Sequence, residues 1–109
     1  MIDIPTIGEV LFEEFMRPFG LSQNALAKAI GVPQNRISDI IAGKRGVSAD
    51  TDLRLCRFFG LTDGYFAGVQ LDFERLTTKR AISAVLQNIV PMKKNNSPVD
   101  DDERIASSI

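Results

Sequence analysis

The sequence predicts a compact all-α domain of five or six short helices, followed by a polar tail. Apolar residues recur at three- and four-residue steps through most of the chain, as they do on the buried face of an amphipathic helix. Serine, threonine, glycine and proline lie at the ends of these runs, where helices are capped or stopped. A chain of 109 residues, 44% of them hydrophobic, is long enough for one small domain with a modest core.

The first predicted helix covers about Ile7 to Arg17. Thr6 and Glu9 have the spacing of a capping box, in which each side chain accepts from the other residue's backbone N–H. Pro18 and Gly20 mark the end of the helix, because neither residue suits a helix interior. Four residues form its expected core face: Val10, Leu11, Phe15 and Met16.

Residues 21–46 predict two short helices separated by a sharp turn, which is a helix-turn-helix. Ser22 suits the N-cap of the first helix, and Gly31 suits its end because glycine tolerates a positive φ. Pro33 is expected at the first position of the second helix, where its missing N–H costs least. The apolar face of the first helix comprises Leu21, Ala25, Leu26, Ala29 and Ile30. The second helix directs three isoleucines inward: Ile37, Ile40 and Ile41.

A fourth helix is expected after Ser48, with Gly60 at its end, and a fifth is expected to begin near Thr62. Residues 66–90 form either one long helix or two. The Thr77–Thr78 pair offers a second N-cap, so two helices are the favoured interpretation. Residues 1–92 would make up one DNA-binding domain, whereas residues 93–109 are too polar to pack and are expected to be disordered.

Charge is distributed unevenly along the chain, although the formal net charge is only −1. Residues 17–57 hold seven basic and three acidic residues, a net of +4, whereas residues 1–16 hold four acids and no base. A basic centre that coincides with the helix-turn-helix favours local binding of phosphates. The alternative is that these charges only solvate exposed helix faces.

The second helix of the motif carries the predicted base contacts in its first turn, at Gln34, Asn35 and Arg36. In a helix-turn-helix this turn enters the major groove, where Gln or Asn matches adenine and Arg matches guanine. Asp39 lies one turn further on. It would either accept from a cytosine amino group or form a surface ion pair with Arg36.

Phosphate contacts are expected on both sides of this helix. Ser22 and Gln23 begin the preceding helix, whose free N–H groups and positive dipole end suit an anion. Lys44 and Arg45 follow the second helix in a glycine-flanked loop, from which flexible cations reach the DNA backbone. Such contacts position a protein on the duplex without reading its sequence.

The late part of the chain, about residues 62–91, is the predicted dimerisation segment. One helix-turn-helix contacts few base pairs, whereas two related by a two-fold axis reach grooves about 34–36 Å apart on a palindromic operator. Four apolar residues at helical spacing would hold a homodimer together: Ile82, Val85, Leu86 and Ile89. The alternative is that this helix folds back onto its own domain.

The composition argues against several other functions. The chain has no histidine and one cysteine, so it lacks the residues for a Cys/His zinc site, a disulfide within the chain or a His-dependent catalytic group. Cys56 lies on an apolar stripe and is interpreted as core. No metal, cofactor or enzymatic activity is expected. No membrane span or secretory signal is evident, which predicts a cytoplasmic protein.

The spacing of Gln23, Ala27, Gly31, Gln34 and Ile37, closing with Gly43, is similar to phage-repressor-like helix-turn-helix domains of the Xre/Cro family. The segments GEVLFEEF and IIAGKRGVSADTDLRL, within residues 8–70, resemble HigA-type antitoxins more specifically. The chain departs from that resemblance in residues 62–73, which lack the tryptophan of the aromatic segment usual at that point.

The resemblance to HigA-type antitoxins implies a DNA-binding antitoxin that represses its own operon. It also implies that the protein neutralises a small ribonuclease toxin by direct binding. The alternative is a stand-alone helix-turn-helix transcriptional regulator with no toxin partner. A purely structural adaptor is disfavoured by the outward polar residues at positions 34–36.

Overall fold

The computed structural model describes residues 4–93, in which all regular secondary structure is helical. This confirms the all-α fold class; residues 94–109 of the expected tail lie outside the described residues. In chain order the elements are α1 (Ile7–Val10), the π-helix η1 (Leu11–Met16), the 3₁₀ helix η2 (Arg17–Phe19), α2 (Gln23–Ile30), α3 (Gln34–Ile41), α4 (Ala49–Phe59), α5 (Tyr65–Ala81) and α6 (Ser83–Asn88).

The predicted capping box begins the first helix. The Thr6 N–H donates to Glu9 Oε1 at 2.9 Å, and the Glu9 N–H donates to Thr6 Oγ1 at 3.1 Å. The helix then widens into η1, tightens into η2 and stops at Gly20, which has a φ of 63°. Local sequence signals therefore located both ends of this helix, although they did not predict the change from α to π geometry.

Serine caps and glycine stops also bound α2 and α4 as predicted. Ser22 Oγ accepts from the Ala25 N–H at 3.0 Å, and Ser48 Oγ accepts from the Thr51 N–H at 3.2 Å. Gly31 and Gly60 follow the two helices with φ values of 75° and 73°. An L side chain is strained at such angles, which explains why glycine terminates both helices.

Three predicted boundaries were wrong by a few residues. Pro33 is the N-cap of α3 with extended backbone, so the helix begins at Gln34 and not at the proline. α5 begins at Tyr65 instead of near Thr62, after the left-handed Gly64. The predicted division into two late helices is present, but it falls at Ile82 (φ −112°) and not at Thr77–Thr78.

The Thr77 side chain does not cap a new helix. Its hydroxyl donates to the Phe73 carbonyl oxygen at 2.9 Å, one turn back within α5. Threonine therefore satisfies its hydrogen bond inside the helix, which removes the signal on which the predicted boundary depended.

The core lies where α1 to α4 meet the first half of α5. Fully buried side chains come from η1 and from each of α2 to α5: Leu11, Met16, Leu26, Ile37, Ile40, Leu55, Cys56 and Phe66. Val10 and Ile30 are buried as predicted, and Phe15 and Ile41 are half-buried. Ala25 and Ala29 were wrongly assigned to the core, because both are exposed, whereas Ala27 is buried in the core.

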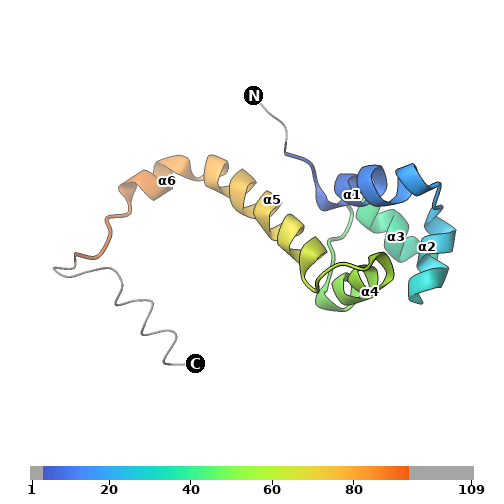
Figure 1. The fold of residues 1–109 in the computed structure, drawn as a ribbon. Coiled ribbons are helices and arrows are strands. Elements are labelled where there is room, and N and C mark those ends of the chain that lie inside the picture. The colour runs from blue at the N-terminus through green and yellow to red at the C-terminus, as the bar shows by residue number, and fades with distance from the viewer. Residues whose placement is uncertain (1–3, 94–109) are drawn as a thin grey trace, which may run out of the picture.

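Beyond this core, the second half of α5 and α6 project away from the bundle, as Figure 1 shows. We call this part of the chain, up to Lys93, the arm. The described residues from Thr78 to Lys93 are all exposed, so the arm has no core of its own. Exposed apolar residues on the arm, among them Val85 and Ile89, are typical of a surface that binds another protein.

Candidate nucleic-acid interface

The second helix of the motif, α3, is held firmly on its inner side. Ile37 and Ile40 are fully buried between α1, α2 and the rest of the core. A Cβ at Gly8 would lie 2.9 Å from both the Cα and the carbonyl oxygen of Ile41, so α1 packs directly on the α3 backbone. The orientation of α3 is therefore fixed by backbone-to-backbone contact.

The outer side of α3 carries the predicted base-reading residues. Gln34 and Asn35 are exposed in the first turn, and Arg36 is half-buried. Arg36 Nε is buried and has no hydrogen-bond partner within residues 4–93. Arg36 and Asp39 form no ion pair in this part of the chain, so the surface-pair interpretation of Asp39 is not supported.

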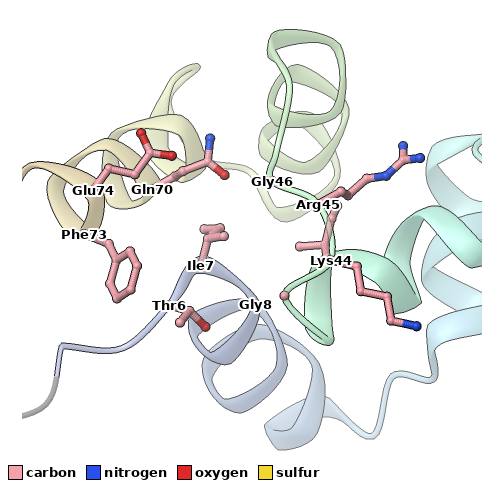
Figure 2. A pocket seen from close by; sticks show the side chains of 11 residues that line it. Thr6, Ile7, Gly8, Lys44, Arg45, Gly46, Gln70, Phe73 and Glu74 are labelled. Atoms are coloured by element: carbon pink, nitrogen blue, oxygen red, sulfur yellow. The ribbon is translucent and has the colours of Figure 1, made fainter. Parts of the chain in front are cut away.

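Lys44 and Arg45 lie beyond the C-terminal end of α3, in a loop that turns back on the helix. Their backbone N–H groups donate to the Asp39 carbonyl oxygen at 2.8 and 3.3 Å. Both side chains are exposed. In Figure 2 they point away from a cavity of about 340 Å³ that lies between the loop, the start of α1 and α5.

Ser22 and Gln23 lie at the N-terminus of α2, as predicted. Ser22 is exposed, and its oxygen already accepts from the Ala25 N–H, which leaves its hydroxyl proton to donate to an anion. Gln23 is half-buried. Lys44 and Arg45 follow the C-terminal end of α3, whereas Gln34, Asn35 and Arg36 form its first turn.

Two of the seven basic residues counted in the sequence have partners of their own. Arg17 pairs with Glu13 at 2.8 Å, and Arg54 pairs with Asp50 at 2.6 Å. Arg54 Nη1 also donates to the Ile30 carbonyl oxygen at 2.7 Å, where it supports the end of α2. Arg54 therefore has a structural role that the sequence did not indicate.

Asp52 is a second residue whose role sequence reasoning missed. Its side chain is buried, and its Oδ2 and Oδ1 accept from the Gly64 and Ala67 N–H groups at 2.8 and 2.9 Å. The carboxylate thus caps α5 from α4, because its negative charge faces the positive end of that helix. Partners twelve or more residues away leave no local sequence signal.

Gln70 is the third missed residue. From α5 its side chain makes two hydrogen bonds to the backbone of Val47, in the segment that joins α3 to α4. It also lines the cavity beside Gly46 and Phe73 (Figure 2).

The four residues of the predicted dimer contact are exposed on the arm. Ile82 and Leu86 are 37% and 39% exposed, and Val85 and Ile89 are 56% and 60% exposed. The helix does not fold back onto the bundle, which was the alternative interpretation. Within residues 4–93 there is no helix long and apolar enough to cross a membrane, and no group of three or more His, Cys, Asp or Glu side chains suited to a metal ion.

Comparison with known proteins gives consistent matches. A helix-turn-helix family model matches residues 12–66. Virulence-associated protein I of Dichelobacter nodosus is 52% identical over 60 residues, which are 53% of this chain and 56% of that protein. Antitoxin HigA-1 of Vibrio cholerae is 36% identical over 66 residues, which are 60% of this chain and 61% of that protein. The chain thus matches little more than half the length of these curated relatives.

A solved structure is similar over a longer range. Pseudomonas aeruginosa antitoxin HigA, solved with the higBA promoter, has a TM-score of 0.76 and 30% sequence identity. The similarity covers 84% of this chain and 100% of that one. It therefore extends beyond the helix-turn-helix and includes much of the arm.

Proposed function

The chain belongs to the HigA-type antitoxins of the helix-turn-helix family, and from this premise we propose that it binds operator DNA and represses its own toxin–antitoxin operon. The observation that carries the proposal is the two-sided character of α3. Ile37 and Ile40 are fully buried on one side, while Gln34 and Asn35 are exposed on the other. A buried inner face orients the helix, and a polar outer face reads base edges in the major groove.

In the proposed complex, residues 34–36 and Asp39 face the bases. Arg36 suits guanine, because its guanidinium donates to both O6 and N7. The free Arg36 side chain has no ion-pair partner to give up within the described residues. Binding therefore does not require an ion pair of Arg36 within these residues to be broken first.

The remaining contacts would be made to phosphates. Ser22 and Gln23 would bind one phosphate at the start of α2, and Lys44 and Arg45 would bind another beyond the end of α3. These two groups flank the recognition helix, so together they would fix its register along the groove.

Two substitutions separate base reading from phosphate binding. Arg36→Ala should weaken binding to the DNA upstream of the gene by about 1–3 kcal/mol and relax discrimination at one base position. Lys44→Ala should weaken binding to all sequences and reduce the salt slope by about one unit. Lys79→Ala, at an exposed position in the last turn of α5, is the matched control. If both test variants bound upstream and random DNA like the wild type, the assignment of α3 would be wrong.

We further propose that the arm forms a homodimer on a palindromic operator. The support is the exposed apolar stripe along α6 and its two cap residues, which no side chain within residues 4–93 covers. Replacing Val85 and Ile89 with Glu would place charge at exposed positions of the monomer, so the fold should survive, but the charges would be buried unpaired in a dimer.

Light scattering tests this dimer. The Val85→Glu, Ile89→Glu variant should be a folded monomer with weak operator binding. Ser83→Glu with Gln87→Glu adds the same charge on the other side of α6 and should remain dimeric. Wild-type monomers at concentrations that saturate the operator would contradict the proposal.

The finer part of the proposal is that the chain also neutralises a small ribonuclease toxin, acting as a non-enzymatic binding protein in the cytoplasm. The family supports it, and the surface that binds the toxin need not coincide with the outer face of α3. An Asn35→Ala, Arg36→Ala variant should then lose repression but still protect growing cells from the co-expressed toxin. Recovery of no toxin with the native protein would instead favour a stand-alone transcriptional regulator.

A further inference from the structure

The carboxamide of Gln70 clamps the backbone of a single residue in a distant segment. Gln70 Oε1 accepts from the Val47 N–H at 2.7 Å, and Gln70 Nε2 donates to the Val47 carbonyl oxygen at 3.0 Å. The two hydrogen bonds thus use both the acceptor and the donor of the Gln70 carboxamide. They join α5 to the segment between α3 and α4, across 23 residues of sequence.

The chain is shaped locally to admit this contact. A Cβ at Gly46 would collide with the Gln70 carboxamide oxygen and lie 3.1 Å from its Cδ, so any larger residue would displace the carboxamide from its position against Val47. Gly46 is not needed for its φ, because it is absent from the glycines with positive φ. Its lack of a side chain therefore serves the approach of Gln70.

The segment held by Gln70 is the one that carries the two phosphate-binding cations. We call residues 43–47 the clamp loop. Its first half is tied to α3, because the Lys44 and Arg45 N–H groups donate to the Asp39 carbonyl oxygen. Its second half is tied to α5 through Val47. Between the loop and Phe73 of α5 lies the cavity of about 340 Å³, so side-chain packing does not fill the space behind the loop (Figure 2).

We propose that Gln70 is a positioning residue for DNA binding, which fixes the clamp loop so that Lys44 and Arg45 are presented to phosphates. This inference rests on the proposed function. Exposed lysine and arginine side chains lose rotamer freedom when they bind, and a fixed backbone limits the entropy that must be lost in addition. Gln70 makes no contact with DNA in this account and acts only through the loop.

The same clamp connects the DNA-binding surface to the arm. Gln70 lies on α5, whose later turns lead to the dimer stripe, and Asp52 holds the start of α5 to α4. The orientation of the arm and the position of Lys44 and Arg45 are thus set by one helix. A dimer formed through the arm would carry both clamp loops at a fixed separation.

Gln70→Met tests the inference, because methionine has a similar length but offers neither an amide donor nor an amide acceptor. Binding is measured to a duplex of the DNA directly upstream of the gene and to a random-sequence duplex, over a series of salt concentrations. Gln70→Met should weaken binding to both duplexes and make the salt slope shallower by about one to two units, as if the cations at 44 and 45 were lost. Gln87→Met on α6 is the matched control and should behave as the wild type.

A double-mutant cycle distinguishes positioning from a general loss of structure. In the Gln70→Met protein, Lys44→Ala should change the affinity for DNA by less than about twofold, which is the error of additivity for independent sites. In the wild-type protein the same substitution should clearly weaken DNA binding. Gln70→Glu keeps the acceptor for the Val47 N–H and should retain an intermediate slope. This variant keeps the test open if Gln70→Met does not fold.

The possible failures differ from one another. If wild-type protein binds no DNA, the proposed function fails, and hydrogen exchange of the Val47 amide still reports whether Gln70 holds the loop. If wild-type protein binds and folded Gln70→Met binds with the same affinity and salt slope, the positioning role is wrong while the proposed function stands. Additive losses from Gln70→Met and Lys44→Ala would also overturn the positioning role.

Discussion

An alanine at Gly8 should destabilise the protein, although alanine favours helices more than glycine does. Its Cβ would collide with the Ile40 carbonyl oxygen and lie 2.9 Å from the Cα and carbonyl oxygen of Ile41. These are backbone atoms of α3, which cannot move aside as a flexible side chain can. Overpacking costs about 1–3 kcal/mol, and rigid neighbours favour the upper end. Alanine regains at most about 1 kcal/mol of helix propensity, so the net loss is about 2 kcal/mol.

The matched control is Gly68→Ala in α5, where an added Cβ meets nothing within 4 Å. This change should gain about 0.4–1 kcal/mol, because only the entropy of the unfolded chain is reduced. Thermal unfolding at one protein concentration measures both variants. With about 4–8 °C per kcal/mol, Gly8→Ala should lower the midpoint by about 10 °C and Gly68→Ala should raise it by a few degrees. Equal stability of Gly8→Ala and wild type would refute the close packing of α1 on α3.

Two hydrogen-bonded caps give further predictions. Asp52→Asn would place an amide donor against the Gly64 or Ala67 N–H, and the unpaired group should cost about 1–3 kcal/mol. Urea unfolding should show a lower midpoint with an unchanged slope, and a wild-type midpoint would argue against this cap of α5. Ser48→Ala should cost about 1 kcal/mol, because the Thr51 N–H loses its acceptor at the start of α4. For Ser48→Ala a loss below about 0.3 kcal/mol would mean that water replaces the hydroxyl.

Much of the fold was predictable because its signals are local. The capping box at Thr6 and Glu9, the serine caps of α2 and α4 and the glycine stops at Gly31 and Gly60 each act within a few residues. Because both partners of each contact lie close together in the sequence, the sequence alone identifies them. The polar first turn of α3 was predictable for the same reason, since the isoleucines of the helix define its inner face.

The contacts that hold the helices together were not predictable in the same way. Gln70 meets Val47 across 23 residues, Arg54 meets Ile30 across 24, and Asp52 meets Gly64 across 12. In each case a side chain bonds to backbone groups, which carry no residue identity, so the sequence gives no sign of the partner. Asp52 and Arg54 were counted only as charges for this reason.

Guanine N7 methylation interference on the DNA directly upstream of the gene tests the central claim most directly, because N7 faces the major groove. A dimer that reads the operator with α3 predicts interference at guanines in two half-sites about one helical turn apart. Arg36→Ala should remove the effect of one guanine in each half-site. Binding that no N7 methylation disturbs, or interference at a single isolated site, would contradict the account.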